Sequence, residues 1–220
     1  MTMPFRPRWY FFIALVSITF IGPLSIHLFI PAMPAVKEAF GVSTGIAQLK
    51  LSLGMMSMAC FTVAYGGLSD RFGRKRVLLG GLVLFTCGAA TCMVAANMPM
   101  LLTGRILQGA GAGCGVVLAR AIARDVYGQD RVAQVIAYLT AAYVLGPMVA
   151  PPIGGQLTTL FGWRALFVFA SAAGLVVVLA VTFAVPETRA RRVAGPHGVF
   201  PATSRCCGAR ASLAICSNPD

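Results

Sequence analysis

Charged residues that could do chemistry are few in this chain, and the densest group of them lies in the stretch GGLSDRFGRKR at residues 66–76. Asp70 and Arg74 are four residues apart, so they can form an ion pair if the segment is helical. Gly73 lies between them and permits a sharp turn. A solvated loop without a specific ion pair is the ordinary alternative, because exposed pairs contribute little.

Two further candidates, Arg105 and His27, stand inside long apolar stretches. Arg105 lies about six residues from the end of its stretch, hence roughly 9 Å deep at a rise of 1.5 Å per residue. An ionised side chain at such depth in a membrane is expensive and by default functional. Histidine is the residue type that gains and loses a proton near neutral pH, which suits a proton carrier. A neutral histidine that is hydrogen-bonded in a helix interface remains an equal alternative.

Enzymatic, metal and nucleotide chemistry find no support in the residue pattern. The seven cysteines contain no CxxC pair, and Cys206, Cys207, Cys216 and His197 fit no common zinc spacing. The stretch GAGAGC fails as a nucleotide loop because Cys114 stands where the last glycine is needed and no strand precedes it. We therefore expect no catalytic residues, no cofactor and no metal.

The composition indicates the class of protein in which these residues are held. Hydrophobic residues make up 58% of the 220 residues and charged residues only 11%, with a mean hydropathy of +0.81. Such values are typical of an integral membrane protein. The formal charge of +12 does not indicate a nucleic-acid partner, because the basic residues form short clusters between apolar stretches. The lipid bilayer is the expected surrounding.

A membrane-spanning helix needs about 20 mostly apolar residues, and six stretches meet this test: about 9–30, 46–66, 77–97, 99–119, 133–154 and 162–185. The first is too long for a signal-peptide core and lacks a clear cleavage site, so we interpret it as an uncleaved span. The predicted fold is an all-α membrane protein, with a six-helix transmembrane bundle over residues 1–188.

The basic residues flank alternate ends of these stretches. One side carries Arg6, Arg8, Arg71, Arg74, Lys75, Arg76, Arg120, Arg124, Arg131, Arg189, Arg191 and Arg192, and the other only Lys37, Lys50 and Arg164. The positive-inside rule then places the N-terminus and the end of the sixth helix in the cytoplasm. Asp125 follows the fourth helix on this side, so we expect it to join Asp70 around Arg74.

Three motifs resemble the major facilitator superfamily. The pattern G-x-L-x-D-R-x-G-R-K is similar to the family's signature loop and occurs as Gly66, Leu68, Asp70, Arg71, Gly73, Arg74 and Lys75. The helix-four element R-x-x-Q-G-x-G occurs as Arg105, Gln108, Gly109 and Gly111, although small residues at such spacing also serve close helix packing. The stretch GPMVAPPIGG resembles the helix-five pattern of the antiporters, with Ala150 replacing one glycine; it contains Gly146, Pro147, Pro151, Gly154 and Gly155. A packing kink alone is the alternative for this last stretch.

A narrower resemblance lies in PLSIHLFIPAMPAV, which is similar to a segment of the Bcr/CflA-type drug exporters, as are RAIARDVY and PETR. His27 replaces the usual aspartate and Phe29 the usual tyrosine. The resemblance implies proton-coupled efflux of amphipathic drugs by alternating access across the inner membrane of a bacterium, with His27, Arg105 and Gln108 in the path of protons or substrate. It also implies two six-helix halves with the path between them.

We draw three expectations from these patterns. Asp70, Arg74 and Asp125 should form one cytoplasmic cluster that latches the outward-facing state. His27 and Arg105 should lie at similar depth, so that a positive charge on one disfavours a positive charge on the other. The third is that the chain alone does not export drugs, because no carboxylate of the six spans can pair with Arg105.

The last part of the chain, residues 189–220, is basic, rich in Pro, Gly, Ser and Cys, and without periodicity. We predict disorder there, and the family resemblance ends near Gly195, as it would after a frame shift. Three possibilities remain open: half of an exporter that works with a second six-helix half, a working homodimer, or an inactive six-helix fragment or assembly module.

Overall fold

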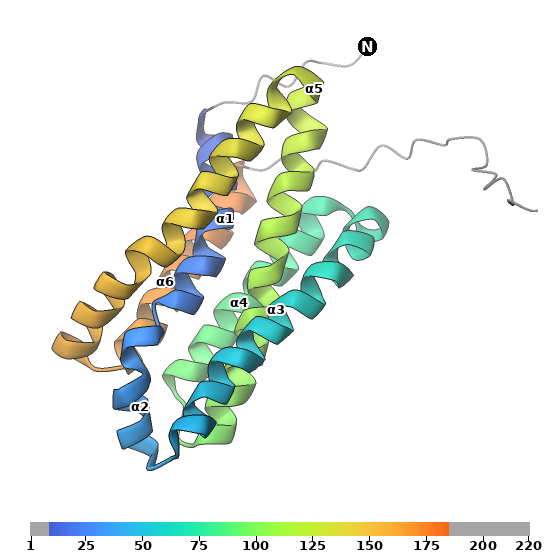
Figure 1. The fold of residues 1–220 in the computed structure, drawn as a ribbon. Helices are drawn as coiled ribbons and strands as arrows, with labels where there is room; N and C mark the ends of the chain where they lie inside the picture. Colours follow the sequence, from blue (N-terminus) through green and yellow to red (C-terminus); the bar gives the residue numbers. More distant parts are fainter. Residues whose placement is uncertain (1–8, 185–220) are drawn as a thin grey trace, which may run out of the picture. The chain divides into compact units, whose positions relative to one another are not determined.

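The computed structural model describes residues 9–184, and this part of the chain is entirely helical (Figure 1). Its long helices are α1 (Trp9–His27), α3 (Thr44–Phe72), α4 (Arg74–Met93), α5 (Met98–Phe161) and α6 (Arg164–Ala184). They provide six spans that are long and apolar enough to cross a membrane. The predicted fold class and the predicted number of spans are therefore confirmed. The predicted tail at 189–220 lies outside the described residues.

Two of the six spans belong to α5, which bends at Gly128. This glycine has φ 65° and ψ 179° and separates an N-terminal segment, Met98–Gly128, from a C-terminal segment, Arg131–Phe161. A positive φ of this kind is accessible to glycine at little cost. Both segments are longer than the stretches 99–119 and 133–154 predicted for them, because a search for apolar residues stops at the first charges while backbone hydrogen bonding continues past them.

The connection after α1 is more ordered than an outer loop. We predicted the first span to reach residue 30, but α1 ends at His27. The 3₁₀ helix η1 (Ile30–Ala32) and the short helix α2 (Met33–Phe40) follow. Pro31 explains the break, because a proline disfavours α conformation in the residue before it and supplies no N–H.

At the centre of the bundle lie α1 and the N-terminal segment of α5. In the most apolar stretch of each, 67% of the residues are buried, compared with 17% in α3 and 22% in the C-terminal segment of α5. Glycines permit the close approach. A Cβ on Gly109 would overlap the backbone of Gly54 in α3, and a Cβ on Gly115 would lie 2.6 Å from the Ile18 carbonyl oxygen in α1. The two central helices thus position whatever polar groups the interior holds.

The apolar interior falls into two clusters. The first includes Phe11, Leu82 and Leu118, and the second includes Leu28 and Phe167. Within the N-terminal segment of α5, the last buried residue of the second cluster is Leu101 and the first of the first cluster is Ala112. Residues 102–111, between these two, hold the polar groups described below.

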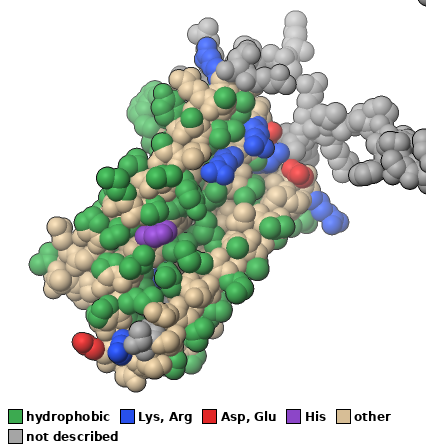
Figure 2. Space-filling model, viewed as in Figure 1, with side chains coloured by type: hydrophobic (Ala, Val, Ile, Leu, Met, Phe, Trp, Pro, Cys, Tyr) green, Lys and Arg blue, Asp and Glu red, His purple; other side chains and the backbone are tan. Residues whose placement is uncertain are grey.

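Charged side chains concentrate at one end of the bundle, which we call the basic end: the end at which α1 begins, α3 meets α4, and α5 bends. On the face shown in Figure 2, Lys and Arg side chains gather toward this end and a smaller charged group lies at the opposite end. The described residues thus carry the charge asymmetry seen in the sequence.

Candidate functional site

A chain of polar side chains joins the two central helices inside the bundle. Arg105 is 6% exposed and Gln108 3% exposed. Arg105 Nη1 donates to Gln108 Oε1 at 3.0 Å, and Gln108 Nε2 donates to Ser25 Oγ at 2.8 Å. Ser25 is itself buried in α1. We call Arg105, Gln108 and Ser25 the buried polar chain.

Two neighbouring aromatic rings contact the guanidinium of Arg105. Its Cζ lies 4.3 Å from the ring centroid of Phe29 and 5.0 Å from that of Phe167. The face of an aromatic ring attracts a cation, the more so where water is excluded. The rings also pack on each other, with centroids 5.4 Å apart. They therefore stabilise the charge without a counter-ion and hold the guanidinium in one place.

The hydrogen-bonding capacity of Arg105 is not used up within the described residues. Its buried Nε has no hydrogen-bond partner there, and no described carboxylate forms an ion pair with it. A guanidinium has five N–H donors, and leaving a buried donor unpaired costs about 1–3 kcal/mol. The described residues thus supply no acceptor for this donor.

His27 lies apart from this chain. Its Nδ1 is 2.8 Å from the carbonyl oxygen of Pro23, one turn earlier in α1. A carbonyl only accepts, so Nδ1 carries the hydrogen, and a neutral ring then offers Nε2 as an acceptor. The side chain is part-buried, and no hydrogen bond joins it to Arg105 among the described residues. The mutual influence of His27 and Arg105 stays a prediction.

The helix-five residues bring the C-terminal segment of α5 against α1. A Cβ on Gly146 would lie 2.9 Å from Pro23 Cβ, and a Cβ on Gly154 would overlap the Leu28 carbonyl oxygen, whereas Gly155 has nothing within 4 Å. The helix continues through Pro147 and Pro151 with helical backbone angles. Gly146 and Gly154 therefore act through close packing on either side of His27.

At the basic end, Arg74 lies between two carboxylates. Its Nη2 is 3.3 Å from Asp70 Oδ1 and its Nε 2.5 Å from Asp125 Oδ2. The Arg74 side chain is 16% exposed, that of Asp125 33% and that of Asp70 66%, so the pair with Asp125 is the better shielded. The structure thus brings together the three residues that we expected to form one cluster.

The other residues of the signature loop surround this cluster. Gly73 has φ 97° at the turn from α3 to α4, and the Gly66 carbonyl accepts a hydrogen bond from Ser69 Oγ at 2.9 Å. Arg71 is exposed, with its Cζ 5.7 Å from the Phe72 ring centroid. Lys75 Nζ donates to the Thr182 carbonyl at 3.1 Å and so ties α4 to the end of α6.

Sequence reasoning missed three residues of the site: Ser25, Phe29 and Phe167. Ser25 was noted only as part of a motif and Phe29 only as a replacement for tyrosine, and Phe167 had no signal at all. The available signal for Ser25 was a hydroxyl in an apolar span two residues before His27. The described residues contain no group of three or more His, Cys, Asp or Glu that could hold a metal.

The fold and the site together define a polytopic α-helical membrane protein with a charged group inside the bundle and a shielded ion-pair cluster at one end. Comparison with known proteins makes the assignment specific. Residues 15–218 match the model of the Major Facilitator Superfamily, and the chain belongs to this family. The expectation that the family resemblance ends near Gly195 was wrong, because the match continues beyond that residue. The family consists of transporters, which agrees with the expectation that the chain is not an enzyme.

Among curated proteins, the chain is 30% identical over 179 residues to Multidrug resistance protein D of Escherichia coli K12, a match that covers 80% of this chain and 44% of that protein. It is 31% identical to Multidrug resistance protein MdtL of Citrobacter koseri, with 81% and 46% covered. The chain thus spans less than half the length of the curated relatives that it matches.

Among solved structures, a peptide transporter POT variant in complex with sulfate superposes with a TM-score of 0.69 at 18% identity, covering 78% of this chain and 37% of that one. The same transporter in complex with alafosfalin gives a TM-score of 0.65. At this identity the likeness establishes the fold alone.

Proposed function

We propose that this chain forms six helices of a proton-coupled exporter of amphipathic drugs, which works by alternating access in the inner membrane of a bacterium. The observation that carries the proposal is Arg105, a cation buried in a span with an unpaired Nε and no described carboxylate partner. A charge in this position is costly and is retained where it contacts substrate, ions or a moving partner.

The substrate class rests on the relatives and on the lining of the site. Multidrug resistance protein D and MdtL are about 30% identical to this chain. Phe29 and Phe167 offer apolar ring surface next to the Arg105 donors, a combination that suits a molecule with one apolar and one polar part.

His27 is the proposed proton carrier within this chain. The Pro23 carbonyl holds one ring nitrogen, which leaves Nε2 to gain and lose a proton as the site faces each side of the membrane. Of the described carboxylates, Glu38, Asp70 and Asp125 all lie near the ends of the spans. None of them lies at the depth of His27.

The Arg74 cluster is the proposed latch of the outward-facing state. It ties the turn between α3 and α4 to the end of the N-terminal segment of α5 through the short contact with Asp125. Opening of the basic end, which we assign to the cytoplasm, would separate these elements and break the pair. The cluster then biases a two-state equilibrium without touching the substrate.

A second six-helix unit is the proposed partner. The outward faces of α3 and of the C-terminal segment of α5 carry large exposed apolar side chains such as Met56, Val63 and Met148. The unpaired Nε of Arg105 likewise calls for an acceptor from another element. A homodimer would bring a second uncompensated Arg105 and a second basic cluster, so we favour a distinct unit.

Drug resistance of a host without its own exporters tests this proposal. The chain is expressed alone, with a separately encoded unit of helices seven to twelve from a relative, and with that unit plus Arg105→Ala. We expect resistance to amphipathic drugs only for the unsubstituted chain together with the second unit, and loss of at least about tenfold of transport rate in the variant, since each 1.4 kcal/mol of lost stabilisation is tenfold.

The matched control is Arg164→Ala, which removes an exposed arginine that stacks on Trp163 and donates to the Ala95 carbonyl at a helix end. It should leave resistance intact. Resistance from the chain alone would contradict the need for a second unit, and resistance that survives Arg105→Ala would contradict the role of the buried cation. No resistance in any combination would favour an inactive six-helix fragment.

A further inference from the structure

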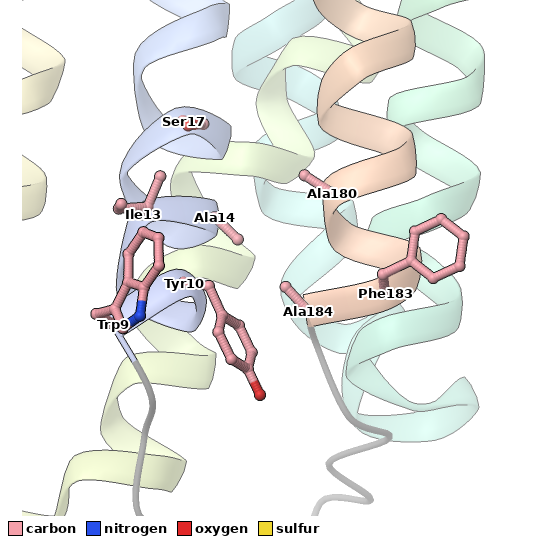
Figure 3. A pocket seen from close by; sticks show the side chains of 8 residues that line it. All are labelled: Trp9, Tyr10, Ile13, Ala14, Ser17, Ala180, Phe183 and Ala184. Carbon is pink, nitrogen blue, oxygen red and sulfur yellow. The ribbon is translucent and has the colours of Figure 1, made fainter.

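A groove between the ends of α1 and α6 has no part in the proposed transport path. It measures about 440 Å³ and is lined by eight residues from these two helices: Trp9, Tyr10, Ile13, Ala14, Ser17, Ala180, Phe183 and Ala184. Its volume falls within the range of small-molecule sites. In Figure 3, Tyr10 and Ala14 project from α1 toward Ala180 and Ala184 of α6.

The groove has an apolar floor and an aromatic rim. Small side chains on both helices line the space, and Ser17 contributes a hydroxyl. At the rim, Trp9 is 76% exposed and Phe183 85% exposed. The Trp9 and Tyr10 rings meet edge to face with centroids 6.4 Å apart. Such a groove fits a hydrocarbon chain, with interfacial aromatic side chains at its mouth.

The position of the groove along the helices indicates which level of the membrane it faces. Trp9 is the first described residue of the first span and Ala184 the last of the sixth span, so the mouth lies at the membrane surface of the basic end. Rings of Trp and Tyr concentrate at this level of a bilayer, where headgroups and hydrocarbon meet. The occupant should therefore have a polar head at the surface and an apolar tail below it.

The charges around the groove favour an anionic head. Lys75 Nζ is bound to the carbonyl of Thr182, the neighbour of Phe183 in α6. Arg76 follows Lys75 in the first turn of α4, at the same end of the bundle. Basic residues at the cytoplasmic ends of spans attract anionic lipid headgroups, each by about 1 kcal/mol. No acidic residue lines the groove.

From these observations we infer that the groove between α1 and α6 is a binding site for an anionic phospholipid of the leaflet at the basic end, with an acyl chain between Ala14 and Ala180 and the phosphate on the side of Lys75. This site is separate from the buried polar chain. Its occupant would stabilise the contact between the first and last spans of the bundle, where α1 otherwise meets α6 over a short stretch.

The fluorescence of Trp9, at the mouth of the groove, tests the inference. The chain has two tryptophans, so Trp163→Phe leaves Trp9 at the mouth of the groove as the only one. The full chain is reconstituted in phosphatidylcholine vesicles that contain a small fraction of lipid with brominated acyl chains, which quench a tryptophan on contact. Phosphatidylglycerol with brominated chains should quench Trp9 several-fold more strongly than brominated phosphatidylcholine at the same fraction, and high salt should reduce the difference.

Substitutions that fill the groove separate the site from general attraction to the surface. Ala180→Leu and Ser17→Leu each place a larger side chain in the groove and should abolish the preference for phosphatidylglycerol. Ala172→Leu is the matched control, because it makes the same change at an exposed position of α6 outside the groove. It should leave the preference unchanged.

Three outcomes would overturn the inference. Equal quenching by the two lipids would mean that Trp9 meets only bulk lipid. A preference that persists in both groove-filling variants would assign it to surface charge alone. Loss of the phosphatidylglycerol quenching on addition of an amphipathic drug, without a change in the quenching by phosphatidylcholine, would make the groove a drug site instead.

Discussion

Arg105 makes two kinds of contact, which compensate a buried charge only in part. It donates one hydrogen bond to Gln108 and lies over two neighbouring phenyl rings, while its Nε has no hydrogen-bond partner among the described residues. A membrane interior makes each unpaired polar atom costly. In the proposed function, the substrate or the second unit supplies the hydrogen-bond acceptor for the Arg105 Nε.

At the scale of the single residue, His27 offers a test of proton coupling. Efflux of a fluorescent drug is measured as a function of pH for the chain with its second unit. A carboxylate ordinarily titrates two to three pH units below an imidazole, so His27→Asp should keep coupling and move the pH dependence of transport to lower pH. His27→Ala should abolish that dependence. If His27→Ala retained it, the histidine would be a packing residue.

A second prediction concerns the partners of Arg74. A double-mutant cycle with Arg74→Ala and Asp125→Ala, read from unfolding of the detergent-solubilised chain, should give a coupling free energy of about 1 kcal/mol, the upper end for pairs that solvent still reaches. The cycle with Asp70→Ala should give only a few tenths of that, because the Asp70 side chain is 66% exposed. Equal coupling to both carboxylates would contradict the ranking by exposure.

At the scale of the element, α1 is held between the two segments of α5. Gly115 admits Ile18 from one side and Gly154 admits Leu28 from the other. Helices that lack a strong hydrophobic drive toward each other in lipid associate through such close backbone contacts. The glycines of the antiporter-like stretch thus serve packing in this structure, and the helix stays regular through its prolines.

The adjacent glycines Gly154 and Gly155 give a matched pair of variants. Gly154→Ala would force its Cβ onto the Leu28 carbonyl oxygen, and overpacking of this kind costs about 1–3 kcal/mol of unfolding free energy. Gly155→Ala meets open space in a helix and should stabilise by about 0.5–1 kcal/mol. Thermal unfolding in detergent measures both; a similar response of the two variants would argue against the close approach of α1 and α5.

At the scale of the whole molecule, the asymmetry of charge predicts its orientation in the membrane. Arg71, Arg74, Lys75, Arg76 and Arg124 lie at the basic end, whereas Lys37 and Arg164 are at the other. The positive-inside rule makes the basic end cytoplasmic. A fluorescent protein fused after Asp220 should therefore fluoresce, and alkaline phosphatase inserted after Ser43 should be active. The reverse pattern would invert the proposed latch.

The sequence by itself determined the features that depend on local composition and spacing. Six apolar stretches of about 20 residues require six spans whatever their packing, and the number of spans was confirmed. The signature-loop spacing also predicted that Arg74 could reach Asp70 within one helix. The pair forms, but the helical geometry assumed for it was wrong, because the chain turns at Gly73 and the two side chains meet across the turn from α3 to α4. Helix ends were less predictable: Pro31 ended α1 early, and polar residues continued α5 beyond its apolar stretches.

Only the tertiary structure decided what surrounds Arg105. Ser25 and Gln108 are 83 residues apart, and Phe167 comes from α6. Whether these side chains meet depends on the rotation of each helix about its axis. Close glycine contacts set this rotation, and it cannot be predicted from the sequence of a helix that is apolar on all sides. Counting along the helices placed His27 and Arg105 at similar depth, yet among the described residues His27 bonds to the Pro23 carbonyl and Arg105 to Gln108. The position of a residue along its own helix sets its depth, whereas a contact depends on the orientation of both helices.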